Sequence, residues 1–239
     1  MNHQLTNSNH DHLHTQFANS VIPTPLRFAD QGAGTGRGIT IAFLDSGFVR
    51  HPDLTFPVNR IVAYEDVTGE NELLSDKVVP ESWHWHGTMT SVVAAGNGYL
   101  SSGVYRGLAP ESDLVLVKVS RGGRILESDI VRGIRWVTEN RSRYGIRILN
   151  ISLGSDIDES YRDSAIDQAA EDAVKAGIVV VVAAGNSGCS DANAIRPPGN
   201  SPSVLTVGGY DDSNSLDPER LGLYCSSYGA TIDGFHKPE

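Results

Sequence analysis

The sequence predicts a three-layer α/β domain, in which a mostly parallel central sheet carries helices on both faces. From Gly38 onward, apolar runs of strand length alternate with amphipathic stretches of helix length. The strand-like runs are continuous and rich in β-branched residues, as in strands that are buried on both faces. This alternation is typical of parallel sheets with helical crossovers, whose ligands bind beyond the carboxyl ends of the strands.

The predicted elements follow in chain order from these runs. Strands are predicted at residues 39–44, 113–119, 146–152, 178–183 and 204–207. Helices are predicted at residues 88–96, 127–143 and 160–176, and the second of them places its apolar residues on one face. Gly177 follows the third helix, where a glycine commonly ends a helix.

Composition and charge indicate one globular domain and argue against some classes of partner. The 239 residues are 39% hydrophobic and 20% charged, which fits one globular domain over residues 38–239 preceded by a polar tail and lead-in at 1–37. The net charge of −10 argues against a nucleic-acid or anionic membrane partner. No apolar run approaches the roughly 20 residues of a membrane span. No signal peptide is visible, which favours an intracellular over a secreted location and leaves the location open. We expect a monomer.

Two further sequence features have simple interpretations. Cys189 and Cys225 are too few for a disulfide framework and are interpreted as ordinary thiols of unknown redox state. The tail segment His10-Asp11-His12-Leu13-His14 has imidazoles that suit a transition metal, but a solvated tail is the favoured interpretation.

An aspartate at a predicted strand end and a histidine at a predicted helix start are the first candidates for catalytic residues. Asp45 ends the first strand run, and His86 comes just ahead of the predicted helix at 88–96. Each alone has a structural explanation, a turn cap for the carboxylate and a packed ring for the imidazole. Together they are two parts of an acid–base relay, in which the carboxylate orients the imidazole that takes and returns a proton.

Five short motifs extend this pair along the chain. In order they are Asp45-Ser46-Gly47 with His51-Pro52-Asp53-Leu54, His86-Gly87-Thr88, Gly107-Leu108-Ala109-Pro110, Asn150-Ile151-Ser152-Leu153-Gly154 and Ala183-Ala184-Gly185-Asn186-Ser187-Gly188. Their order and content resemble the subtilases, the subtilisin-like serine peptidases. The resemblance runs from about Gly38 to Glu239 and implies a subtilisin-like fold and the hydrolysis of peptide bonds in peptide or protein substrates.

The resemblance also implies roles for particular residues. Asp45 would orient His86, and His86 would act as general base and then general acid. Asn186 would donate its side-chain amide to the oxyanion, and Ser152, Leu153 and Gly154 would pair with an extended substrate. The alternatives are structural, with a helix or turn cap at Asn186 and a turn at Gly154.

Departures from the family limit what this chain is expected to do. The helix after His86 continues as Met89-Thr90-Ser91-Val92, where the family has a second histidine, a valine and an alanine-glycine pair. The family's Gly-Thr-Ser nucleophile motif does not occur in the sequence. The resemblance places it beyond Glu239, so we expect a C-terminally incomplete fold and an inactive fragment of a serine endopeptidase. The alternative is a catalytically inactive, protease-like domain that binds peptides.

No cofactor is required by the implied chemistry, although a structural calcium ion remains open. Asp53 resembles a calcium-ligand position in relatives, and a turn-capping carboxylate after Pro52 explains it equally well. His84 lies between Trp83 and Trp85. It is predicted to be a surface histidine, with a place in the cleft as the alternative.

Overall fold

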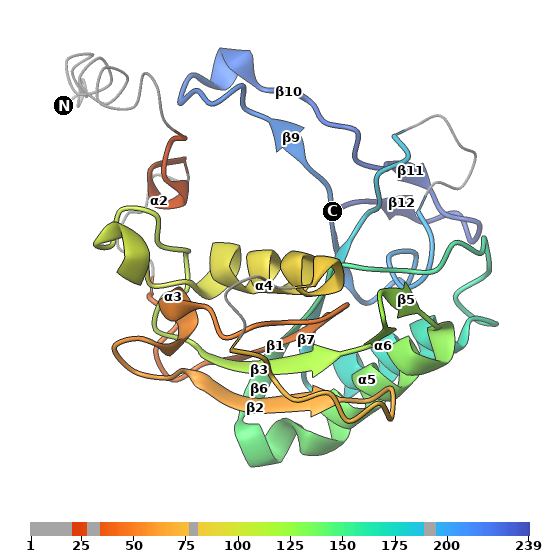
Figure 1. The fold of residues 1–239 in the computed structure, drawn as a ribbon. Coiled ribbons are helices and arrows are strands. Elements are labelled where there is room, and N and C mark those ends of the chain that lie inside the picture. Colours follow the sequence, from red (N-terminus) through yellow and green to blue (C-terminus); the bar gives the residue numbers. More distant parts are fainter. Residues whose placement is uncertain (1–20, 28–33, 77–80, 189–194) are drawn as a thin grey trace.

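The computed structural model describes residues 21–27, 34–76, 81–188 and 195–239. Its centre is a six-stranded sheet with the order β2-β3-β1-β6-β7-β8, in which neighbouring strands are all parallel (Figure 1). The strands are β1 (Thr40–Asp45), β2 (Ile61–Asp66), β3 (Asp113–Lys118), β6 (Ile146–Ile151), β7 (Val179–Ala183) and β8 (Leu205–Val207). The predicted parallel sheet is confirmed, and five of its strands are the predicted ones to within one or two residues at each end.

Helices cover both faces of this sheet and make three layers (Figure 1). On one face lies α4 (Ser82–Ala95), and on the other lie α5 (Glu127–Tyr144) and α6 (Ala165–Lys175). Alternate residues of β1 face opposite layers: Ile41 and Phe43 belong to the apolar cluster on the α4 side, and Ala42 and Leu44 to the cluster beneath α5 and α6. Burial of each large apolar side chain contributes roughly 1.5–3 kcal/mol, so the two clusters fix β1 firmly in the centre of the sheet.

The strand β2 was not predicted from the sequence. It lies at an edge of the sheet, pairs only with β3, and most of its residues are half-buried. Its apolar run is only four residues long, Ile61 to Tyr64, and Glu65 and Asp66 follow it directly, so the pattern was too short to identify the strand.

Two helix starts differ from the prediction. The helix α4 begins at Ser82, six residues before the predicted start, so His86 lies within the helix rather than ahead of it. The helix α6 begins at Ala165, because Ser164 caps it by accepting a hydrogen bond from the backbone N–H of Asp167.

Shorter elements complete the described chain. They are α2 (Thr24–Arg27), α3 (Pro52–Thr55), the 3₁₀ turns η1 (Tyr99–Ser101) and η2 (Pro218–Arg220), and six two-residue strands: β4 (Ser120–Arg121), β5 (Arg124–Ile125), β9 (Tyr210–Asp211), β10 (Gly222–Leu223), β11 (Gly229–Ala230) and β12 (His236–Lys237). The pairs β4–β5, β9–β10 and β11–β12 are antiparallel.

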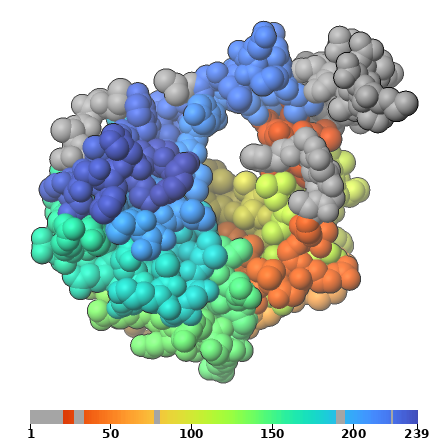
Figure 2. Space-filling view, turned by 180° about the vertical axis from the view of Figure 1, so that it is seen from behind, coloured from red at the N-terminus to blue at the C-terminus, as the bar shows by residue number. Residues whose placement is uncertain are grey.

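The β9–β10 arm reaches across the α4 side of the molecule toward α2 (Figure 1). Asn214 in this arm accepts a hydrogen bond from the backbone N–H of Ile22, at 2.8 Å, and another from Arg27. Arg27 also forms an ion pair with Asp212. Figure 2 shows an opening between this arm and the body of the molecule.

Several predicted features lie on residues that the structure does not describe. Most of the predicted tail, including His10, His12 and His14, lies outside the described residues, and so does Cys189. Cys225 is an exposed free thiol. None of the helices in the described ranges is long and apolar enough to cross a membrane.

Candidate active site

The structure brings Asp45 and His86 into direct contact. Asp45 is the last residue of β1 and only 2% exposed, and His86 lies in the second turn of α4 with 44% of its side chain exposed. The Nδ1 atom of His86 lies 2.9 Å from Oδ1 of Asp45 and 3.0 Å from Oδ2. The pair therefore has a buried carboxylate that orients the ring and an imidazole edge that faces solvent, as an acid–base relay requires.

The carboxylate of Asp45 is held by its own neighbours. The backbone N–H of Ser46 donates to Oδ1 at 2.7 Å, and the hydroxyl of Ser46 lies 3.2 Å from the same atom. The hydroxyl of Thr90, one turn of α4 beyond His86, lies 3.4 Å from Oδ2. These donors fix the orientation of the carboxylate and satisfy it in a buried position.

Asp45 also changes the electrostatics of His86. The hydrogen bond to Asp45 raises the pKa of the His86 imidazole above its ordinary value, and partial burial opposes that rise less strongly. A proton accepted by His86 is thus stabilised by the buried carboxylate, which is the property that a general base needs after it takes up a proton.

Two glycines allow α4 to approach the end of β1 so closely. A Cβ atom on Gly87 would lie 2.4 Å from the carbonyl oxygen of Gly47 and 2.8 Å from Cβ of Asp45. A Cβ atom on Gly47 would lie 2.8 Å from the ring of His84. The Asp-Ser-Gly and His-Gly-Thr motifs therefore place glycine where two backbones meet, with a catalytic candidate beside each.

The other predicted residues line a cavity of about 360 Å³ beyond the carboxyl ends of β6 and β7. Ser152, Leu153 and Gly154 form one side of it, and Asn186 is exposed on the loop that follows β7. A Cβ atom on Gly154 would lie 2.7 Å from the carbonyl oxygen of Pro197, so that position requires glycine. The full lining is Ser152, Leu153, Gly154, Ser155, Asp156, Ala183, Ala184, Gly185, Asn186, Ser187, Arg196 and Pro197.

The loop that carries Asn186 is held by a segment about forty residues later in the chain. The backbone N–H of Ser227 donates to the carbonyl of Gly185 at 2.9 Å, and the buried hydroxyl of Ser227 accepts from the N–H of Ser187 at 3.0 Å. Gly188 donates to the carbonyl of Cys225 at 3.1 Å. Residues 225–227 therefore fix the position from which Asn186 faces solvent.

Asp53 makes the contacts of a capping residue. Its Oδ1 accepts a hydrogen bond from the backbone N–H of Leu100 at 3.0 Å, and its carbonyl accepts from Arg60 and from the N–H of Asn97. Among the described residues no cluster of three or more His, Cys, Asp or Glu side chains could hold a metal ion. These contacts agree with the capping interpretation of Asp53, and a structural calcium ion at Asp53 stays a prediction.

The prediction that His84 is a surface histidine is wrong. His84 is 1% exposed, and its Nε2 atom lies 2.6 Å from the carboxylate of Glu72. The same carboxylate contacts the buried ammonium of Lys118 at 3.2 Å. The sequence signals for this cluster were a lysine that ends a buried strand and an acidic stretch at residues 65–72, but neither shows which residue it pairs with.

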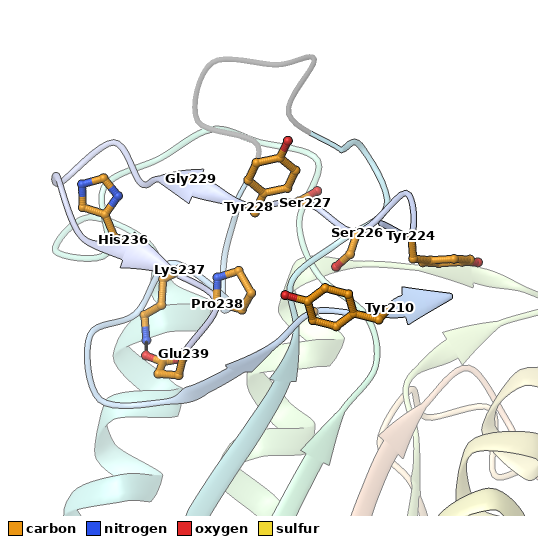
Figure 3. A pocket seen from close by; sticks show the side chains of 12 residues that line it. Tyr210, Tyr224, Ser226, Ser227, Tyr228, Gly229, His236, Lys237, Pro238 and Glu239 are labelled. Atoms are coloured by element: carbon orange, nitrogen blue, oxygen red, sulfur yellow. Dashed lines mark hydrogen bonds and ion pairs between the residues drawn. The ribbon is translucent and has the colours of Figure 1, made fainter. Parts of the chain in front are cut away.

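Two further cavities were not anticipated. One of about 650 Å³ lies along the outer side of α4, between Trp85 and Leu100. Another, of about 600 Å³, begins where β8 ends, and Figure 3 shows Tyr210 and Tyr224 on one of its sides and Lys237 and Glu239 on another. Lys237 pairs there with Glu239, whose carboxylate accepts from the N–H of Thr206 at 2.7 Å. These contacts hold the residues 237–239 against β8, which explains them structurally.

Comparison with known proteins agrees with this architecture. The sequence model of the subtilase family matches residues 36–239. Serine protease AprX of Bacillus subtilis (strain 168) is 39% identical over 214 residues, which cover 86% of this chain and 46% of AprX. Subtilisin BL of Lederbergia lenta is 32% identical over 201 residues, which cover 83% of this chain and 63% of that protein. The chain thus spans about half the length of AprX and less than two thirds of subtilisin BL.

Solved structures show the same likeness. The S41 psychrophilic protease superposes with a TM-score of 0.66 at 29% identity, covering 88% of this chain and 67% of that one. Sphericase superposes with a TM-score of 0.64 at 27% identity and the same coverage.

Proposed function

Because the chain belongs to the subtilase family of serine proteases, we propose that Asp45 and His86 are the acid–base pair of an endopeptidase that hydrolyses peptide bonds. The observation that carries this proposal is the contact of His86 Nδ1 with both carboxylate oxygens of Asp45. That contact leaves Nε2, on the exposed edge of the ring, to exchange a proton with a nucleophile.

In this mechanism His86 takes the proton of a serine hydroxyl as the serine attacks the substrate carbonyl. His86 then returns the proton to the leaving amine, and Asp45 stabilises the imidazolium between these two steps. The raised pKa of His86 supports this role, because it reflects the stabilisation of the protonated ring by Asp45.

The cavity beside Asn186 supports the binding part of the proposal. A substrate in extended conformation would pair with the backbone of Ser152, Leu153 and Gly154, and Asn186 would donate its amide to the tetrahedral oxyanion. One such donor contributes on the order of 10²–10³ in turnover. An amide suits this task because it donates a hydrogen bond and does not titrate.

The nucleophile is the part of the mechanism that residues 1–239 do not supply. No Gly-Thr-Ser sequence occurs among them. Ser46 is hydrogen-bonded to the carbonyl of Trp83 at 2.6 Å, and Ser91 is buried and donates to carbonyls of its own helix. We propose that a serine encoded beyond the codon for Glu239 completes the triad, and that residues 1–239 alone do not turn over peptides.

The first experiment is to read the source DNA past the codon for Glu239. We expect an open frame that reaches a Gly-Thr-Ser motif, and we expect its product to cleave casein and to be labelled at that serine by a fluorophosphonate. Residues 1–239 are the control and should show neither property. An open frame without the motif, or a product with the motif that neither cleaves nor reacts, would refute the endopeptidase.

The alternative function is a peptide-binding domain without catalysis. The observation that favours it is the combination of an intact cavity at residues 152–156 and 183–187 with a sequence that lacks the nucleophile motif. A stop codon directly after Glu239, together with saturable binding of a fluorescent casein peptide by the 239-residue chain, would support this alternative.

A further inference from the structure

A buried lysine lies beside the acid–base pair. Lys118 ends β3, is completely buried, and is the lateral neighbour of Asp45 in the parallel register of β1 and β3. Its ammonium contacts three carboxylates on the other side, at 3.4 Å from Asp66, 3.1 Å from Glu70 and 3.2 Å from Glu72. A buried charge requires this kind of pairing, and here it comes from one short stretch of chain.

That stretch, residues 66–72, is folded by Asp66. One carboxylate oxygen of Asp66 accepts from the N–H and the hydroxyl of Thr68, and the other accepts from the N–H of Glu72 at 2.8 Å. The chain therefore turns back immediately after β2. As a result Glu70 and Glu72 reach the end of the neighbouring strand β3, where Lys118 lies.

Glu72 is the member of this cluster that also contacts α4. Its Oε2 atom lies 3.2 Å from the ammonium of Lys118, and its Oε1 atom lies 2.6 Å from Nε2 of His84. The Nδ1 atom of His84 accepts a hydrogen bond from the backbone N–H of Glu81 at 3.3 Å. His84 therefore carries its proton on Nε2 and donates it to Glu72.

These contacts fix the start of α4 on the sheet. His84 is the third residue of the helix, and its side chain caps the backbone of Glu81, the residue that precedes the helix. The carbonyl of His84 also accepts from Thr88, whose hydroxyl accepts from the N–H of Val49 after β1. His86 lies within this same anchored turn, so the position of its ring depends on where the turn is held.

The carboxylates also determine which way Lys118 points. Asp45 and Lys118 face the same side of the sheet on strands that lie roughly 4.8 Å apart, so an ammonium at this position is within reach of Asp45. In the structure the ammonium lies with Asp66, Glu70 and Glu72 instead, and Asp45 contacts His86. The acidic stretch thus keeps a competing cation away from the carboxylate of the pair.

We propose that Glu72 is a positioning residue for the acid–base pair: through His84 it anchors the turn of α4 that carries His86, and through Lys118 it keeps Asp45 available to that ring. The catalytic importance of this positioning rests on the proposed function. The positioning contacts themselves all lie within residues 45–118 and do not depend on it. Glu72 touches neither His86 nor a substrate, and acts through His84 and Lys118.

The test uses the ¹⁵N-labelled 239-residue chain and long-range ¹H–¹⁵N spectra of its imidazoles, with His86 assigned by its loss in His86→Gln. Two readouts are followed, the downfield proton of the Nδ1–H bond to Asp45 and the pH at the midpoint of the His86 titration. The variants are Glu72→Ala, Glu72→Gln and His84→Phe. Glu70→Gln is the matched control, because Glu70 contacts Lys118 and is not bonded to His84. Thermal melts by circular dichroism establish that each variant folds.

We expect Glu72→Ala and His84→Phe each to lose the downfield signal and to shift the His86 midpoint downward. Glu72→Gln should restore part of the signal, because its amide oxygen accepts from His84. Glu70→Gln should keep the downfield signal, because Asp66 and Glu72 still hold Lys118 and His84 stays bonded to Glu72. If Glu72→Ala does not fold, His84→Phe and the Gln variant decide the outcome.

A merely structural Glu72 would lower the melting temperature and leave both His86 readouts unchanged in the folded variants, and this result overturns the proposal. A parent chain that lacks the Nδ1–H signal contradicts the acid–base pair itself, and the proposal with it. A third outcome separates the two proposals. If the 239-residue parent shows the signal but the longer product of the open frame does not cleave peptides, the proposed function is refuted and the positioning role of Glu72 stands.

Discussion

The Nδ1 atom of His86 lies 2.9 Å and 3.0 Å from the two carboxylate oxygens of Asp45, across a junction between a strand end and a helix start. Neither residue is held by the other alone. Ser46 fixes the carboxylate through its backbone N–H, and His86 lies in the second turn of α4, directly after the helix start that His84 caps. The junction is close because Gly47 and Gly87 occupy it, and this gives the first prediction.

Gly87→Ala is expected to destabilise the fold by about 1–3 kcal/mol or more, because its Cβ atom would meet the carbonyl of Gly47 and the Cβ atom of Asp45. Gly34→Ala is the control, since no atom of the described residues lies within 4 Å of its Cβ position. Urea denaturation curves measure the stability of both variants. Equal midpoints for the two variants would show that the junction can relax, contrary to this account.

Lys118→Met should cost up to about 3–5 kcal/mol at neutral pH, because it leaves the buried carboxylate of Asp66 without its cation, while Glu70 and Glu72 are partly exposed to solvent. Burial lowers the pKa of Lys118, but the bonds to Glu70 and Glu72 outweigh it, so the pKa is raised and the lysine stabilises the fold until the pH passes above 10.5. Burial raises the pKa of Asp66, but the hydrogen bonds from Thr68 and Glu72 and the charge of Lys118 together lower it by more, so that carboxylate stabilises the fold above about pH 4.

The loss in Lys118→Met should therefore be largest between about pH 4 and pH 10 and should shrink below pH 4 as Asp66 takes up a proton. Lys175→Met is the control, because Lys175 forms an exposed pair with Asp172 at 3.1 Å. Denaturation at about pH 3 and pH 7 measures the stability of both variants. A loss in Lys118→Met no larger than that of the control would mean that the buried cluster does not stabilise the fold.

Asp167→Asn is expected to stabilise the protein at alkaline pH. Asp167 is completely buried, neither of its carboxylate oxygens has a hydrogen-bond partner in the part of the chain that the structure describes, and burial raises its pKa to about 7. An acid whose pKa is raised on folding contributes its full stability below its unfolded pKa of about 4 and loses it as the pH rises through 7. The parent should therefore lose stability across this range.

The gain from Asp167→Asn at pH 8.5 should be on the order of 2–4 kcal/mol and should fade toward pH 4. Asp172→Asn, an exposed position of the same helix, is the control. Melting temperatures at pH 4, 6 and 8.5 decide the matter. If the melting temperatures of Asp167→Asn and the parent differ by the same amount at all three pH values, then folding does not shift the pKa of Asp167 in this range.

Gly154→Ala should weaken peptide binding, because the added methyl group would lie 2.7 Å from the carbonyl of Pro197 and would displace a wall of the cavity beside Asn186. The measurement is the fluorescence anisotropy of a labelled casein peptide, with Gly34→Ala as control. Undiminished affinity in a folded Gly154→Ala variant would place the peptide elsewhere on the surface.

The sequence was most informative about the centre of the sheet. The strands β1, β3 and β7 are mostly apolar and β6 carries four apolar residues, which is typical of buried parallel strands, and Asp45 is the last residue of β1. The strand β2 was missed because its apolar run is only four residues long and is followed at once by Glu65 and Asp66.

The start of α4 and the state of His84 depend on contacts between distant segments. The segment Trp83-His84-Trp85-His86 has little helix propensity, and the first turn forms because His84 bonds Glu81 at the N-cap and Glu72 outside the helix. Asp66 and Lys118 are 52 residues apart and meet only because β2 and β3 pair. Local sequence patterns contain no information on such pairings.

The most direct test of the account is the hydrolysis of casein by the product of the open frame that extends past Glu239, compared with its Asp45→Asn variant. The variant keeps the shape of the side chain but no longer holds His86 in the productive tautomer. We predict a fall in kcat of about 10⁴-fold with KM little changed, as the loss of the orienting carboxylate produces in serine protease triads. A folded Asp45→Asn variant that retains kcat within tenfold of its parent would contradict the central claim that Asp45 and His86 act as one acid–base pair.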